Sequence, residues 1–266
     1  MRWGSAANEK TGAFGLTSSA GPLVLRVEAA GRNASDYRAG QGWRNAAGGH
    51  TVQGSFSDGQ AGTVGLSWVG EQGYLGAAYT QQRAQYGLPG HEHAHCHLHG
   101  IYDIHCGSHG SHGGHGGHHH EAHAHEAVPE VDMTSHRWDV RGEWRRPVAG
   151  VQALRLKASH TRYGHDEKEA GQVATMFRNR ANDVRVELQH APIAGWRGMV
   201  GISQGLSHFS ADGEEEFIPA TRTLQRGLFM LQERQWQDWS VQAALRHDWQ
   251  NTRQRQGSEK RSHHAT

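Results

Sequence analysis

Ten segments of the chain alternate apolar and polar residues with a period of two. In residues 138–145 (WDVRGEWR) every second residue is Trp, Val or Gly, and each residue between them is charged. Successive residues of a strand face opposite ways, so each segment predicts a strand with one apolar and one charged face. We expect strands near 10–18, 22–31, 60–69, 73–83, 132–145, 151–163, 176–190, 196–209, 222–234 and 239–250. Most reach the roughly 9–11 residues that a tilted strand needs to cross a bilayer.

The connections between these segments alternate in length. Five are tight and rich in Gly and Pro, at 19–21, 70–72, 146–150, 191–195 and 235–238. Between them lie long polar stretches near 32–59, 84–131, 164–175 and 210–221. Short turns at one end of the strands and long loops at the other are typical of outer-membrane barrels. We therefore expect an all-β fold, an antiparallel transmembrane β-barrel with long extracellular loops.

Aromatic residues gather beside the tight turns: Trp68, Trp144, Trp196, Trp236, Trp239 and Tyr74. An aromatic girdle is expected at each rim of a membrane barrel. A soluble β-sandwich or lipocalin-like barrel also alternates. Such a fold would bury its apolar face, would not need tryptophans at its turns, and would have strands of about 5–6 residues. The pattern favours the membrane barrel, with polar residues lining its lumen.

Charge and the amino terminus exclude other classes. The formal net charge of +1 offers no basic face for nucleic acid. No run of 18 apolar residues provides a transmembrane helix. Met1 leads into polar sequence without a signal peptide, so we expect either a cytoplasmic protein or a piece of a longer one.

Fourteen of the 23 histidines lie between His91 and Glu126. These candidate metal ligands are His91, His93, His95, His97, His99, His105, His109, His112, His115, His118, His119, His120, His123 and His125. The first five recur at every second residue, so in an extended chain they share one face. The later ones are spaced by three among glycines, which fixes no geometry. Neutral imidazole suits Zn²⁺, Cu²⁺ and Ni²⁺, and intrinsic affinity favours copper.

This tract predicts a collector of several transition-metal ions at modest affinity. Glu92, Asp103, Glu121 and Glu126 could add oxygen ligands. The alternatives are a solvated low-complexity insertion without a selected role and an affinity tag, although the tract is internal and irregular.

Cys96 and Cys106, the only cysteines, lie inside this tract. Outside the cell a disulfide is the default for such a pair, and it would close a ring carrying His97, His99 and His105. Thiolate ligation of the metal is the rival interpretation.

Two acidic stretches occur in the long loops that we expect at the same mouth. They comprise His165, Asp166, Glu167 and Glu169, and Asp212, Glu214, Glu215 and Glu216. They could hold a second cation, raise the local cation concentration, or be solvated loop tips.

Two long stretches resemble a known family. NEKTGAFGLTSSAGPLVLRVEAAGRNASDYR and FSDGQAGTVGLSWVGEQGYLGAAYTQQRAQYGLPGHEHAHCH resemble the barrel of TonB-dependent outer-membrane receptors, and FRNRANDVRVELQHAPIAGWRGMVGISQG and WSVQAALRHDW continue the likeness. The most similar group is the zinc-uptake (ZnuD) type, whose third extracellular loop is rich in histidine. The likeness covers nearly the whole chain, although no single motif is diagnostic.

The departures from that family predict a fragment. Family members carry a plug domain, a TonB box and 22 strands, whereas this sequence shows neither plug nor box and about ten strands. We expect residues 1–266 to form a partial barrel that lacks the plug and the C-terminal strands, with 84–131 as its His-rich extracellular loop. A self-sufficient ten-strand barrel, like the outer-membrane proteases, is the alternative.

The resemblance implies a receptor of the Gram-negative outer membrane that captures Zn²⁺ for TonB-dependent uptake, not an enzyme. Its implied partners are outer-membrane lipid, the metal ion, and the TonB system through the missing plug, with no nucleic acid. The alternatives are a metal-buffering or surface-interaction barrel without transport, and a haem receptor, because histidine also ligates haem iron.

Overall fold

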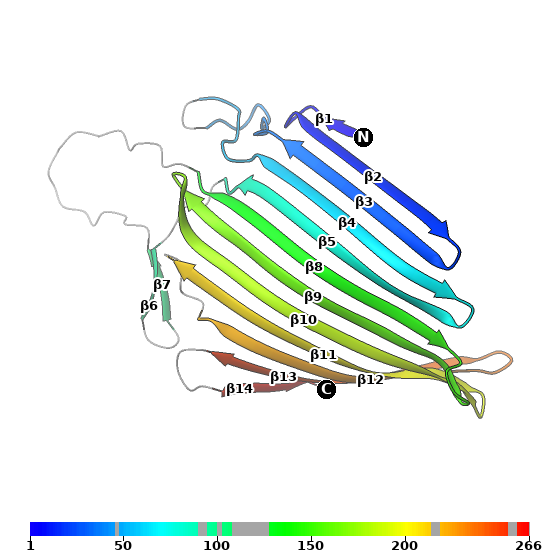
Figure 1. The fold of residues 1–266 in the computed structure, drawn as a ribbon. Coiled ribbons are helices and arrows are strands. Elements are labelled where there is room, and N and C mark those ends of the chain that lie inside the picture. Colours follow the sequence, from blue (N-terminus) through cyan, green and yellow to red (C-terminus); the bar gives the residue numbers. More distant parts are fainter. Residues whose placement is uncertain are drawn as a thin grey trace, which may run out of the picture.

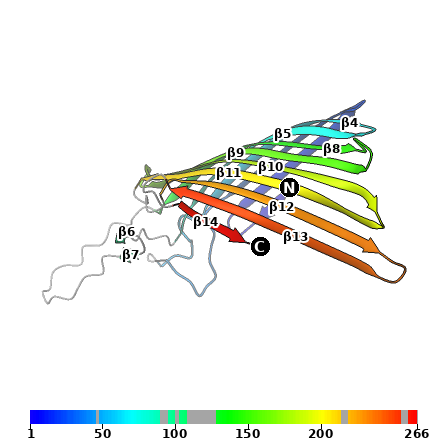
Figure 2. The same cartoon turned by 90° about the horizontal axis from the view of Figure 1, so that it is seen from below.

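The computed structural model describes residues 1–45, 48–89, 95–99, 103–107, 128–213, 219–254 and 260–265. Twelve antiparallel strands form one open sheet in which each strand pairs with its neighbours in sequence (Figures 1 and 2). They are β1 (Arg2–Gly4), β2 (Glu9–Ala20), β3 (Leu23–Ala34), β4 (Ser57–Gly70), β5 (Gly73–Gly87), β8 (Glu130–Arg145), β9 (Val151–Glu169), β10 (Gln172–Ile193), β11 (Trp196–Gly213), β12 (Thr221–Gln235), β13 (Ser240–Gln254) and β14 (Lys260–Ala265). No helix of the described residues is long and apolar enough to cross a membrane.

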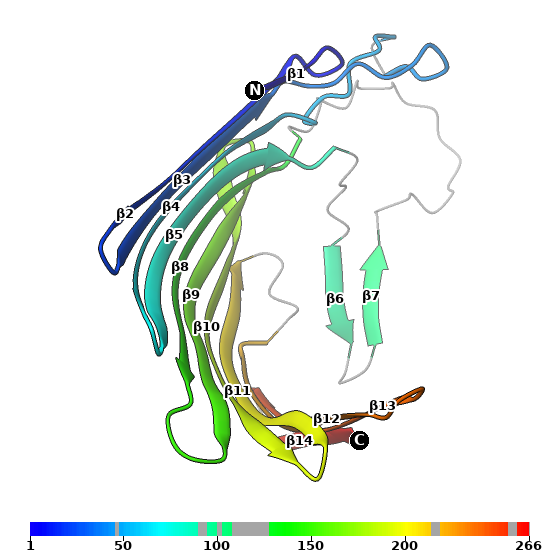
Figure 3. The ribbon, with the colours of Figure 1, turned by 90° about the vertical axis from the view of Figure 1, so that its right-hand side faces the viewer.

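All ten predicted strands are confirmed, as β2–β5 and β8–β13, and each extends beyond its predicted bounds by one or more residues. The short strands β1 and β14 lie outside these ten segments. A separate hairpin of β6 (His95–His99) and β7 (Asp103–Gly107) lies within the connection from β5 to β8. Figure 3 shows that the large sheet curves strongly and that this hairpin lies on its concave side.

The prediction of a long polar loop at 164–175 is wrong. The strands β9 and β10 continue through this stretch and join at the two-residue turn Ala170–Gly171, where φ is 47° and 80°. Two successive residues with positive φ make the tight turn whose twist suits a hairpin. Residues 165–169 are polar at every position, so their composition suggests a loop although the chain continues as a strand.

The two faces of the sheet differ as the alternation predicts. On the convex face apolar side chains are exposed, and we call this band the apolar belt: Leu16, Leu25, Leu66, Leu75, Trp144, Leu156, Ile202 and Leu228. The buried apolar residues of the described chain all lie on the concave face, where side chains converge: Ala34, Val131, Ala153, Phe177, Ala211 and Phe229. Exposed apolar side chains on the outer face of a curved sheet are typical of a wall that meets lipid.

Tryptophans near the tight turns are exposed, which fits the predicted girdle. Trp144 is 52% exposed and Trp239 75% exposed. Trp236 packs edge-on against Trp196, with 6.2 Å between the ring centroids. Amphipathic indole rings at this level suit a boundary between hydrocarbon and water.

Candidate functional site

The His-rich connection joins β5 to β8 at the end of the sheet that carries the long connections (Figure 1). Of the fourteen predicted ligands, only His95, His97, His99 and His105 belong to described elements, in β6 and β7. The other ten lie outside the described residues: His91, His93, His109, His112, His115, His118, His119, His120, His123 and His125. The predicted metal ligation therefore stays a prediction.

The register of the hairpin brings the predicted partners opposite one another. Cys96 pairs with Cys106, His97 with His105, and His99 with Asp103. Sequence spacing alone left the arrangement of the cysteines open, and the register places their backbones face to face.

The first acidic stretch does not form the single cluster that the sequence suggested. Because it belongs to β9, its residues alternate between the two faces. On the concave side, Nε2 of His165 lies 3.8 Å from Oε1 of Glu167. On the convex side, Asp166 forms an ion pair with Arg178 at 2.6 Å. In the second stretch Asp212 ends β11, and Glu214, Glu215 and Glu216 lie outside the described residues.

His165 is packed between two aromatic rings. It stacks on Phe177 with 4.5 Å between centroids and meets Tyr163 edge-on. Burial lowers the pKa of His165, and the charge of Arg178 lowers it further. Within the described parts of the chain, no group of three or more His, Cys, Asp or Glu side chains could hold a metal ion.

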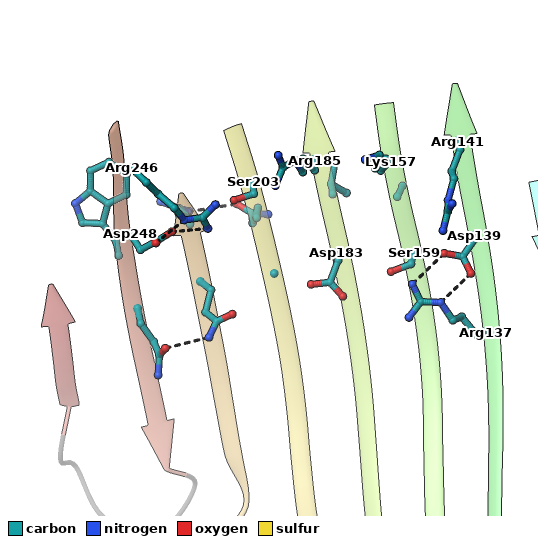
Figure 4. Close-up of a pocket in the computed structure, with 18 residues that line it drawn as sticks. Arg137, Asp139, Arg141, Lys157, Ser159, Asp183, Arg185, Ser203, Arg246 and Asp248 are labelled. Carbon is teal, nitrogen blue, oxygen red and sulfur yellow. Dashed lines mark hydrogen bonds and ion pairs between the residues drawn. The ribbon is translucent and has the colours of Figure 1, made fainter. Parts of the chain in front are cut away.

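The concave face carries a polar wall that the sequence predicted only as a lumen lining. A hollow of about 590 Å³ lies over β8 to β13. Figure 4 shows Arg141, Lys157 and Arg185 side by side on adjacent strands, and we call them the concave basic row. Gly205 on β11 lines the hollow, and a Cβ there would lie 2.9 Å from Oδ1 of Asp183.

Acidic side chains stand in the rows on both sides of the concave basic row. Toward the long connections, Asp139, Ser159 and Asp183 are directly opposite one another. Toward the tight turns the row is Glu143, Arg155 and Glu187. This face is therefore nearly neutral although it is densely charged.

Ion pairs on this face form both along a strand and between neighbouring strands. Asp139 accepts hydrogen bonds from Arg137 at 2.8 and 2.9 Å. Glu143 accepts one from Arg155 at 2.7 Å. The wall offers many hydrogen-bonding groups and no preorganised metal ligand set, so it suits a polar passage. The alternation of apolar and polar residues in the sequence predicts this polar face. It does not predict which residues of neighbouring strands lie opposite one another, and that register creates the rows.

Comparison with known proteins identifies the fold. No model of a known protein family matches the chain. Among solved structures, the FrpB iron transporter from Neisseria meningitidis (F3-3 variant) matches with a TM-score of 0.74 at 11% identity, over 97% of this chain and 42% of that chain. The copper transporter OprC matches with a TM-score of 0.70 at 9% identity, over 97% of this chain and 39% of that chain.

The fold is that of part of a TonB-dependent transporter barrel. The chain spans less than half the length of the transporters it matches. These structural neighbours are transporters and not enzymes. At such low identity the match concerns the fold alone.

Proposed function

We propose that this chain belongs to the barrel of a TonB-dependent receptor in the Gram-negative outer membrane, and that the receptor takes up Zn²⁺ captured at residues 91–125. The observation that carries the proposal is the position of the fourteen histidines, in the connection at the end of the strands where the long connections lie. Metal caught there would stand at the mouth of the polar concave wall. Both matched proteins are metal transporters by name, FrpB of iron and OprC of copper.

The hairpin β6–β7 supports a partly ordered first binding region. Alternate positions of a strand share a face, so positions 95, 97, 99, 103 and 105 fall on one face of the hairpin and 96 and 106 on the other. Directly opposite residues of antiparallel strands have Cα atoms about 4.5–5.5 Å apart, within the range of a disulfide. A disulfide between Cys96 and Cys106 would hold the hairpin that presents the histidines.

Uptake would then proceed as in other TonB-dependent receptors. The TonB system would act through a plug domain of the full receptor, and lipid would surround the apolar belt. A barrel that buffers metal without transporting it is the second candidate, and its chemistry at the histidines is identical. A copper cargo is the third, because imidazole favours Cu²⁺ intrinsically and one matched structure is a copper transporter.

The test is equilibrium zinc binding by the protein expressed from its own gene, compared with a variant that lacks residues 91–125. We expect more than one Zn²⁺ per chain and the loss of most of it in the variant. A matched control shortens the other long connection, 35–56, which carries only His50. Equal zinc binding by both variants would remove the histidines as the capture site, and zinc uptake by whole cells separates a transporter from a buffer.

A further inference from the structure

Six basic side chains form an unbroken row across six strands of the convex face. We call it the convex basic row, and in order from β8 to β13 it is His136, Arg162, Arg180, His208, Arg222 and Arg253. Each member is directly opposite the next in the register of the sheet. Like charges in this position repel one another, which destabilises the sheet unless an opposite charge is supplied.

The row lies at the loop-side margin of the apolar belt. Along β9, Leu154 begins the exposed apolar positions and Arg162 follows eight positions later. That separation is about 26 Å along the strand, or roughly 20 Å along the membrane normal once strand tilt is included. The row therefore stands where a bilayer's hydrocarbon layer gives way to its headgroups.

Acidic side chains on this face do not neutralise the row. By register the nearest ones form one row four residues beyond it, Asp132, Asp166 and Asp212; of these, Asp132 is paired with Lys168 at 3.1 Å and Asp166 with Arg178 at 2.6 Å. Arg162 donates to a histidine, Nε2 of His160 at 3.2 Å. None of the row's four arginines has an acidic partner among the described residues, and all four are exposed.

A shallow hollow of about 1040 Å³ follows the row, and all six of its members line it. Five spacings between neighbouring strands make the row about 24 Å wide. Arginine presents a planar fork of donors that matches phosphate, and rows of basic residues beside a bilayer attract anionic headgroups.

We propose that the convex basic row binds the phosphate groups of the glycolipid in the outer leaflet, lipid A. The site is distinct from metal capture, because it is on the lipid-facing side of the sheet, and the two carboxylates that also line the hollow, Asp132 and Asp166, are ion-paired with Lys168 and Arg178. The inference rests on the outer-membrane setting proposed above but not on zinc. Bound phosphates supply the negative charge that the row lacks within the chain.

The test is lipid A retained by the protein when it is extracted from outer membranes into a neutral detergent and measured by mass spectrometry. The variant replaces the four arginines with glutamine (R162Q, R180Q, R222Q and R253Q). Each replacement is expected to weaken binding about fivefold, so together they should lower affinity by at least two orders of magnitude. Rebinding is then measured with bisphosphorylated and with dephosphorylated lipid A, and only the first should bind tightly.

A charge-matched control makes the same four-charge change on the concave face (R26Q, R32Q, R141Q and K157Q), and it should retain lipid A as the unmodified protein does. Equal retention by both variants, or equal binding of the dephosphorylated lipid, would overturn the site. If inorganic phosphate at millimolar concentration displaces lipid A completely, the site binds free anions. That result would overturn the lipid assignment. Absence of the protein from the outer membrane would overturn the proposed function and this inference together, whereas its presence there without lipid A would overturn this inference alone.

Discussion

Two rows of basic side chains cross the same strands on opposite faces, and they differ in what neutralises them. The concave basic row lies between two rows that carry acidic residues, and Arg185 is bonded directly to Glu187. The convex basic row has no acidic residue among its members, and two of the three acids nearest to it, Asp132 and Asp166, form ion pairs with residues outside the row. One face balances its charge within the chain, while the other depends on what surrounds it.

This difference follows from the environment of each face. Concave side chains converge on one another and bury part of their surface, so an uncompensated charge there would be costly. Convex side chains diverge toward the surroundings, where an ionic headgroup can approach each arginine. We therefore expect the removal of a single charge to have opposite effects on stability on the two faces.

The largest effect is expected from Glu187→Ala on the concave face. Glu187 is only 6% exposed and accepts a hydrogen bond from Nε of Arg185 at 2.5 Å. Its loss leaves Arg185 unpaired beside Lys157, so we expect the free energy of unfolding to fall by about 2 kcal/mol, less than for a fully buried pair because Arg185 stays partly exposed. Urea titration in zwitterionic detergent, followed by tryptophan fluorescence, measures it.

The control for this prediction is Glu28→Ala. Glu28 also accepts from an arginine at 2.5 Å, Arg26, but both side chains are well exposed. Exposed pairs contribute little, so the expected loss is below about 0.5 kcal/mol. Similar losses in both variants would show that the concave wall does not rely on buried compensation.

A smaller effect, with a sign that depends on the surroundings, is expected from Arg180→Gln in the convex basic row. In neutral detergent the change relieves repulsion from Arg162, so stability should rise by about 0.5 kcal/mol and the gain should shrink in salt. In bilayers containing lipid A the same change should lower stability, because a phosphate contact is lost.

Lys157→Gln is the partner variant on the concave face. It should change stability in the same direction in detergent and in lipid A bilayers, since headgroups do not reach that face. A sign reversal in Lys157→Gln, or none in Arg180→Gln, would remove the distinction between the two rows.

Sequence alone predicted the strands and their faces because alternation is a local property. The ten segments, the tight turns and the polar lumen lining all followed from which residues neighbour each other in the chain. The hairpin turn at Ala170–Gly171 was missed because a charged strand that continues beyond the membrane has the composition of a loop. Burial and apolar faces no longer mark a strand once it leaves the bilayer.

Neither basic row could be predicted from the sequence. Arg162, Arg180 and Arg222 each look like an isolated surface charge in their own segments. They become a row only through the registers of three strand pairs, which depend on turn geometry and strand stagger. For the candidate metal ligands the sequence is the more informative source. It gives their number and spacing, whereas ten of the fourteen lie outside the described residues.

The smallest effect on stability is expected at the end of β9, beyond both basic rows. Here too the convex and concave faces differ in how their charged groups are paired. On the convex side Asp166 is ion-paired, while on the concave side His165 stacks on Phe177 and its Nδ1 is buried without a hydrogen-bond partner among the described residues. Burial lowers the pKa of His165 below its ordinary value. The unfolded chain therefore binds a proton more readily than the folded one, and stability falls as the pH drops below about 6.5.

His165→Gln removes the titrating group, so the variant should lose less stability than the unmodified protein between pH 7.5 and pH 5. Urea titrations of both proteins at the two pH values measure this difference. An acid-induced loss that is equal in the two proteins would show that protonation of His165 is not resisted by its packing, and that the concave face tolerates an added positive charge at this level.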